Sequence, residues 1–146
     1  MVLNDAGRVV EFVWGELPVR FDRVELDEFV VMPNHIHCIF VLCRRGEPCV
    51  RPMFDQPAKQ GEHKVRPYGT LPNTVGRIVQ AFKSLATHEY INGVKQHGWP
   101  PFPGKLWQRN YYEHVIRNEN ELNRIREYII NNPKKWEFDR DNPDVM

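Results

Sequence analysis

The chain has 146 residues, of which 41% are hydrophobic and 27% charged, and its formal net charge is +1. This is enough material for one domain, and the composition excludes wholesale disorder, while the lack of a long apolar run excludes a membrane span. The N-terminus lacks the basic start and apolar core of a secretory signal, so we expect a soluble cytoplasmic protein. The charges form a basic middle between acidic ends, which fits either a polyanion-binding face or an ordinary mixed surface.

The first half of the chain predicts one helix and one hairpin. Apolar residues recur at helical spacing between a cap at Asn4 or Asp5 and Pro18, which we expect to end the helix. Residues 24–32 and 36–43 are rich in β-branched and aromatic side chains, and a Pro-Asn turn signal lies between them. These two segments therefore predict an antiparallel hairpin.

The middle of the chain predicts an insertion and then a second helix. Residues 44–72 hold five prolines and three glycines without a sustained period, which indicates a flexible insertion. A wide apolar stripe follows, beginning at a cap at Asn73 or Thr74 and ending at Asn92 and Gly93.

The last part of the chain predicts a third strand, a final helix and a tail. Residues 106–116 have the aromatic and β-branched content of a strand. The final helix is bounded by Asn118, with Glu121 as a capping-box partner, and by Pro133, and the acidic tail 137–146 is expected to fray. Together the elements predict an α+β fold, an antiparallel sheet with its helices mainly on one face.

Three cysteines, Cys38, Cys43 and Cys49, form no Cys-x-x-Cys pair. This argues against a structural zinc site, and we expect free thiols.

Two histidines at the start of the second predicted strand are a candidate metal site. Because side chains two apart on a strand point to the same face, the imidazoles of His35 and His37 should project together. An incidental pair of surface histidines explains a lone His-x-His pattern about equally well. Their place at a turn, at the rim of a sheet, favours a ligand-binding role.

The final helix carries a second candidate pair. Tyr128 and Asn132 lie one turn apart on the same helix face, beside its apolar stripe. Each has a plain structural alternative, since the tyrosine could be a packing residue and the asparagine a helix-ending residue. With the two imidazoles, however, an amide oxygen makes an N/O site suited to Mn²⁺ or Mg²⁺, and a phenol beside it could attack a phosphodiester.

Two segments of the sequence resemble a known family. Pro33-Asn34-His35-Ile36-His37, followed far downstream by LWQRNYYEHVIRNENELNRIREYIINNPKKW at 106–136, closely resembles the REP-associated and insertion-sequence tyrosine transposases of the HUH superfamily. The resemblance runs from about Val2 to Trp136, which predicts a single HUH transposase-like domain over 1–136.

The resemblance implies roles for the four candidate residues. The family's His-hydrophobic-His pair binds the divalent metal, which falls on His35 and His37. Its nucleophilic tyrosine falls on Tyr128, and the residue that completes the metal site falls on Asn132. The implied activity is a Mg²⁺ or Mn²⁺ dependent single-strand DNA endonuclease and strand transferase. It would recognise DNA hairpins, form a 5′-phosphotyrosine and free a 3′-OH.

Basic residues around this motif are candidates for DNA contacts. Lys83, Arg109, Arg117 and Arg124 could bind phosphates, although solvated surface charge explains each about equally well.

Family members usually begin with a strand before the first helix, and here the helix cap follows Met1 almost directly. We therefore expect that strand to be lacking, which would expose sheet edges and favour a homodimer. Two alternatives stay open: a domesticated or truncated relative that binds hairpin DNA without cutting it, and a water-using phosphodiesterase in which Tyr128 is structural.

Overall fold

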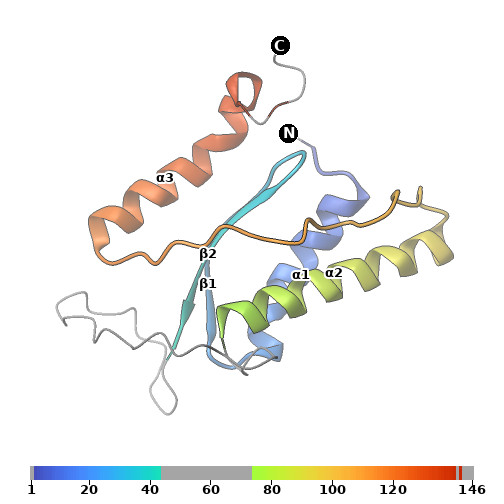
Figure 1. The fold of residues 1–146 in the computed structure, drawn as a ribbon, viewed down its shortest axis with the longest axis horizontal. Helices are drawn as coiled ribbons and strands as arrows, with labels where there is room; N and C mark the ends of the chain where they lie inside the picture. Colours follow the sequence, from blue (N-terminus) through green and yellow to red (C-terminus); the bar gives the residue numbers. More distant parts are fainter. Residues whose placement is uncertain (1, 44–73, 141, 143–146) are drawn as a thin grey trace.

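The structure, a computed structural model, describes residues 2–43, 74–140 and 142. Its elements in chain order are α1 (Asp5–Arg20), β1 (Val24–Val31), β2 (Ile36–Leu42), α2 (Val75–His97), α3 (Glu119–Lys135) and the short 3₁₀ helix η1 (Trp136–Phe138) (Figure 1). An antiparallel sheet with three helices makes this an α+β fold, as predicted. The expected insertion at 44–72 lies outside the described residues.

Helix α1 begins where the sequence predicts and ends slightly later. The Asn4 side chain accepts a hydrogen bond from the Gly7 N–H at 2.9 Å and caps the first turn. The prediction that Pro18 ends the helix is wrong, because the helix continues to Arg20. A proline so near the end removes only one hydrogen bond, and the Phe21 N–H still closes the last turn on the Leu17 carbonyl at 2.8 Å.

The predicted hairpin forms. Strands β1 and β2 pair antiparallel, and the Met32 N–H donates to the His35 carbonyl at 2.8 Å across the turn. The register shifts between Leu26 and Phe29 of β1, and both of these side chains pack toward the same core. Because alternation would put residues three apart on opposite faces, the shift is what lets both reach that core.

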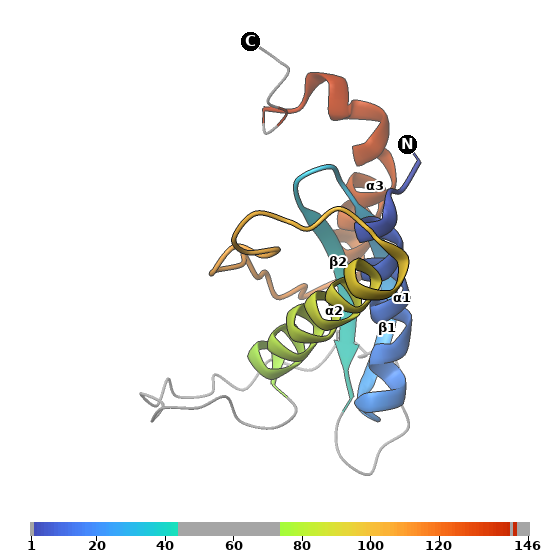
Figure 2. The ribbon, with the colours of Figure 1, turned by 90° about the vertical axis from the view of Figure 1, so that its right-hand side faces the viewer.

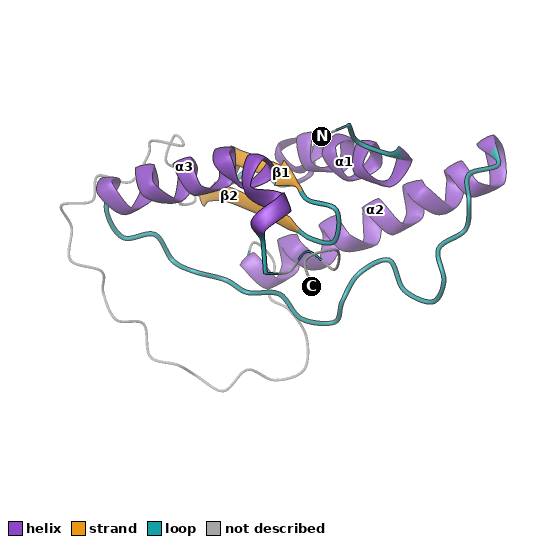
Figure 3. Cartoon of the chain, turned by 90° about the horizontal axis from the view of Figure 1, so that it is seen from above, coloured by secondary structure: helices purple, strands orange, loops and turns teal. Residues whose placement is uncertain are grey.

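Helices cover both faces of the hairpin. Two of the three, α1 and α2, lie on one face and α3 on the other (Figures 1 and 3). The main core is on the α1 and α2 side, where the Trp14 ring stacks on Phe29 with centroids 4.8 Å apart. Its buried members are Val10, Val13, Trp14, Leu17, Val24, Ile78, Phe82 and Ala86.

Helix α2 is longer than the sequence predicts. It passes the expected stop at Asn92 and Gly93 and ends at His97, capped by Gly98 in the left-handed region at φ 66°. Packing explains why residue 93 is a glycine, because a Cβ there would lie 2.0 Å from the Trp99 indole. This glycine lets the indole lie against the helix.

The predicted third strand is wrong. Residues 106–116 form no strand, and 108–115 are exposed (Figure 2 shows the long loop between α2 and α3). The start of the segment is anchored where the Trp107 ring lies 5.6 Å from Phe82 and the Lys83 ammonium donates to the Gln108 carbonyl at 2.9 Å, and its end where His114 hydrogen-bonds Glu121 at 2.7 Å. Strand-type residues form a strand only when another strand edge is in register to pair with them.

Helix α3 begins as predicted and runs past its expected end. The Asn118 side chain accepts from the Glu121 N–H at 2.8 Å, and the helix passes Pro133 to reach Lys135. The Glu121 carboxylate accepts a hydrogen bond from the Arg117 N–H at 3.0 Å. In a standard capping box the carboxylate would instead accept from the N–H of the cap residue, which is Asn118 here.

Cys38 is a free thiol in β2, whereas Cys43, just after the strand, is disulfide-bonded. The expectation of free thiols is therefore wrong for Cys43, because an odd number of cysteines still permits one pair. No described helix is long and apolar enough to cross a membrane.

Candidate functional site

The hairpin turn brings the two histidines side by side. His35 is the last residue of the turn and His37 the second residue of β2. Their rings meet edge to face with centroids 4.7 Å apart, and their Nε2 atoms are 3.0 Å from each other. The two ring nitrogens therefore converge on one point in space.

This separation suits two neighbouring ligands of one metal ion. A ligand atom lies about 2.1 Å from a small divalent cation, so two ligands at a right angle are about 3.0 Å apart. The Nε2 atoms of His35 and His37 already have that spacing. The pair could bind an octahedral cation on adjacent positions without moving the backbone.

Asn34 orients the first of these rings. The His35 Nδ1–H donates to the Asn34 side-chain oxygen at 2.6 Å. Because a neutral imidazole carries one proton, a proton on Nδ1 leaves Nε2 with the lone pair that a metal requires. From the sequence alone, Asn34 is expected only to form the turn. A polar residue directly before a candidate ligand is a signal that could have suggested its second role, that of orienting the ring.

Tyr128 lies against the second ring. Its aromatic ring meets that of His37 edge to face at a centroid distance of 5.4 Å, and 54% of the tyrosine is exposed. The ring of Trp136, just after α3, is tilted by 49° to that of His35, with the two centroids 6.1 Å apart. The C-terminal half of α3 therefore faces the hairpin turn, and the tyrosine hydroxyl belongs to a partly open site.

Asn132 lies one turn beyond Tyr128 and is buried, with 3% of its surface exposed. Its Nδ2 atom has no hydrogen-bond partner among the described residues. A buried N–H donor without a partner costs free energy and calls for an acceptor such as a bound water, whereas a cation would bind the carboxamide oxygen. The helix-ending role weighed for this residue is wrong, because α3 continues past it to Lys135.

This donor set fits a hard divalent cation. No group of three or more His, Cys, Asp or Glu side chains gathers anywhere in the described ranges. Two imidazole nitrogens and a carboxamide oxygen are a smaller set that leaves positions for water and phosphate oxygens, as Mg²⁺ and Mn²⁺ require. The residues present are therefore suited to that metal class.

The four candidate basic residues lie elsewhere. The Lys83 ammonium is on α2, bound to the Gln108 carbonyl and 5.6 Å from the centre of the Tyr111 ring. Arg109 is exposed on the loop after α2. Arg117 and Arg124 are exposed at the start of α3. The rings of His35, His37 and Tyr128 instead contact one another and Trp136.

Electrostatics at the start of α3 centre on Glu121. The backbone N–H of Arg117 and the His114 side chain both donate to its carboxylate, and they lower the pKa of Glu121 below the ordinary value. Hydrogen bonds to the ionised form favour that form. The carboxylate strengthens the helix start, where negative charge is also favoured by the helix dipole.

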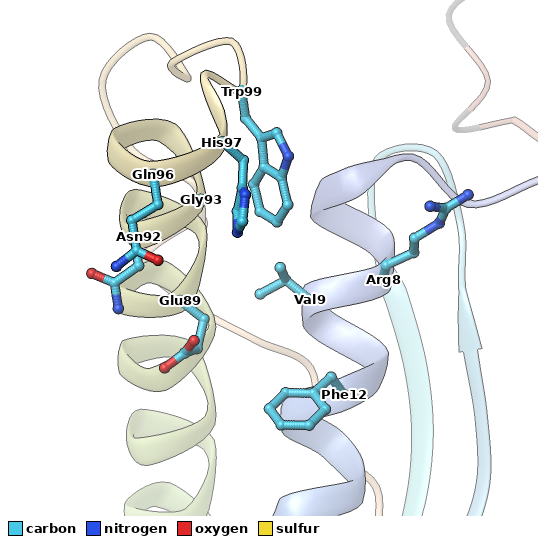
Figure 4. A pocket seen from close by; sticks show the side chains of 9 residues that line it. All are labelled: Arg8, Val9, Phe12, Glu89, Asn92, Gly93, Gln96, His97 and Trp99. Carbon is cyan, nitrogen blue, oxygen red and sulfur yellow. The ribbon is translucent and has the colours of Figure 1, made fainter.

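A separate hollow lies between α1 and α2. Its walls include Val9, Phe12, His97 and Trp99, and none of its lining residues belongs to the histidine and tyrosine site. Figure 4 shows the His97 and Trp99 rings facing the gap between the helices, whereas Arg8 and Gln96 point away from it. Its charged and amide groups therefore do not converge on one point.

Comparisons with known proteins give one relative. An uncharacterized protein of Haemophilus influenzae is 37% identical over 143 residues, which cover 96% of this chain and 71% of the relative. The chain belongs to the family of that protein. No family model matches the sequence, and no solved structure matches it. The relative's description names no activity, so the case for function depends on the site.

Proposed function

We propose that the protein is a metal-dependent tyrosine transposase that nicks and joins single-stranded DNA at hairpin-containing ends. The observation that carries this proposal is the contact between Tyr128 on α3 and His37 on β2, beside His35. A phenol next to two converging imidazole nitrogens is the arrangement expected of a tyrosine nuclease. The same residues occupy the positions that matter in the HUH transposases that the sequence resembles.

The proposed reaction is a transesterification. The Tyr128 oxygen attacks the scissile phosphorus, so that the bond from tyrosine oxygen to phosphorus forms as the bond from phosphorus to O3′ breaks. The phenolic proton leaves to solvent or a base, and the departing oxygen takes up a proton to become a 3′-OH. The phosphate remains a diester, which keeps the product attached and lets an incoming 3′-OH reverse the step.

His35, His37 and Asn132 would hold Mg²⁺ or Mn²⁺. When bound, such a cation withdraws charge from a phosphate oxygen and neutralises the charge that develops there. The chain's own contribution is to fix the ring of His35 through Asn34 and to hold the phenol of Tyr128 beside His37.

Single-stranded or hairpin DNA is the proposed substrate. Lys83, Arg109, Arg117 and Arg124 would contact its phosphates, with Arg117 and Arg124 at the start of the helix that bears the tyrosine. Phosphate contacts of this kind position the nucleic acid without reading its sequence. A protein with this activity would work at the nucleoid.

A covalent adduct tests the proposal. The protein is mixed with labelled single-stranded hairpin DNAs from the repeats that flank its gene, with and without Mn²⁺, and denatured in SDS. We expect a Mn²⁺-dependent adduct that Tyr128→Phe abolishes. Tyr112→Phe is the matched control, because this tyrosine is 91% exposed on the loop before α3 and should leave the adduct intact.

Other outcomes would contradict the proposal. Cleavage that survives in Tyr128→Phe without an adduct would identify a water-using phosphodiesterase. Hairpin binding by folded protein without cleavage would identify a DNA-binding protein that does not cut.

A further inference from the structure

An ion pair joins the middle of α3 to the middle of β1. The Arg126 Nε donates to the Asp27 Oδ1 at 2.7 Å, and Nη2 of the same guanidinium donates to Oδ2. The pair is therefore bidentate, the strongest geometry for these two groups. Only 19% of the arginine side chain and 9% of the aspartate side chain are exposed, so solvent screens the pair little.

Strand alternation explains why Asp27 reaches α3, because its neighbour Leu26 faces the core on the other side of the strand. Leu26 and Phe29 both pack toward the α1 and α2 core, so the irregularity between them accommodates Asp27 and Glu28. A bulge of this kind re-aims side chains. Here the bulge returns Phe29 to the core side, while Asp27 stays on the side that faces α3.

Apolar packing alone attaches α3 weakly. Its buried residues are Ile129 and Asn132, whereas Tyr128 and Ile130 are more than half exposed. Arg126 is two positions before the tyrosine, so its anchor restrains the turn of helix that carries Tyr128. The hydrogen bonds to Asp27 raise the pKa of the Arg126 guanidinium above its ordinary value.

We propose that Asp27 and Arg126 are positioning residues, which hold α3 in the orientation that places Tyr128 against His37. Neither residue touches the reacting atoms. Loss of either partner removes the bidentate pair and leaves the other side chain mostly buried, which favours a displaced helix in which that side chain reaches water. The effect of the pair on adduct formation rests on the proposed role of Tyr128. Its effect on the orientation of α3 does not.

The placement of the helix is measured first, in protein without DNA or metal. In the wild type we expect a nuclear Overhauser effect between the Tyr128 and His37 rings and another between Trp14 and Phe29, which are close in the structure. Arg126→Gln and Asp27→Asn should each remove the first signal and keep the second. Lys134→Gln is the matched control on the same helix, since it removes one positive charge from an exposed side chain.

The adduct assay then reads the consequence. In Arg126→Gln the rate of adduct formation at saturating DNA should fall about 100-fold, the scale of a misplacement of about 1 Å, while the Kd for hairpin DNA is unchanged. Arg126→Lys should be intermediate, because lysine keeps the charge and loses the planar fork.

The outcomes separate this inference from the proposed function. If the wild-type protein forms no adduct, the transposase proposal fails, and the ring signals still decide whether the pair positions α3. If the Tyr128 to His37 signal survives in Arg126→Gln and Asp27→Asn, the inference is wrong and the role of Tyr128 stands. Loss of both ring signals in Arg126→Gln and Asp27→Asn, with both kept in the control, would also overturn it, because the pair would then hold the whole fold.

Discussion

Replacing Asn34 by alanine should weaken metal binding without removing a metal ligand. In the wild type the Asn34 oxygen accepts the His35 Nδ1–H at 2.6 Å and keeps the proton away from Nε2. Without this acceptor the proton can move to Nε2, and that tautomer cannot bind a cation there. His35 then has to change tautomer before it binds the metal.

The magnitude follows from the strength of this hydrogen bond. A typical hydrogen bond contributes about 0.5–1.5 kcal/mol net, and loss of a partner that orients a metal ligand typically costs about 10–100-fold in affinity. The bond from His35 to Asn34 is exposed to solvent, so water can replace part of it. We therefore expect the lower end, a loss of about tenfold in Mn²⁺ affinity, which is about 1.4 kcal/mol.

Calorimetric titration with Mn²⁺ measures this loss, and ¹⁵N chemical shifts of the His35 ring report the tautomer. Asn34→Asp is the conservative variant and should bind Mn²⁺ at least as tightly as the wild type, because a carboxylate accepts the same proton. Asn120→Ala, an exposed change on α3, is the control. If Asn34→Ala binds Mn²⁺ as the wild type does and keeps the Nδ1–H tautomer, Asn34 does not orient the ring.

Three further predictions concern stability. Gly15→Ala should stabilise the protein by up to about 1 kcal/mol, because nothing lies within 4 Å of the added Cβ on α1 and alanine favours a helix. Gly93→Ala should destabilise the protein by about 1–3 kcal/mol, because overpacking against Trp99 outweighs the gain in helix propensity. If urea unfolding shows a more stable variant, the indole moves aside freely. The lowered pKa of Glu121 means that its stabilising effect is present above its ordinary pKa of 4.5 and is lost as the pH falls through the lower folded value. Hydrogen-exchange protection at the first turn of α3 should therefore decrease below about pH 4 in the wild type, and a similar decrease in Glu121→Gln would contradict this assignment.

Local patterns in the sequence predict the hairpin and the pairing of its histidines. Two runs of β-branched residues around a Pro-Asn turn have few other ways to fold, and a spacing of two residues puts both imidazoles on one face. The caps of α1 and α3 form at Asn4 and Asn118 for the same local reason. These features depend on atoms within a few residues of each other.

Helix ends and the third strand were predicted less well, for two reasons. A proline removes one hydrogen bond, and a glycine costs about 1 kcal/mol, so neither must end a helix that packing extends. Pro18, Gly93 and Pro133 all lie inside helices. Residues 106–116 have the composition of a strand, but pairing needs a neighbouring edge that composition does not report.

The groups that this protein offers for chemistry follow from its sequence. They are two imidazoles on one strand face, and a phenol and a carboxamide on one helix face. Only the tertiary structure decided that these two faces meet, with the Tyr128 ring against that of His37 and Asn132 buried. The pair of Asp27 and Arg126, 99 positions apart, depends on a helix orientation that no local pattern encodes. Contacts of this kind arise from packing between distant segments, because the free energy that selects them is shared across the whole core.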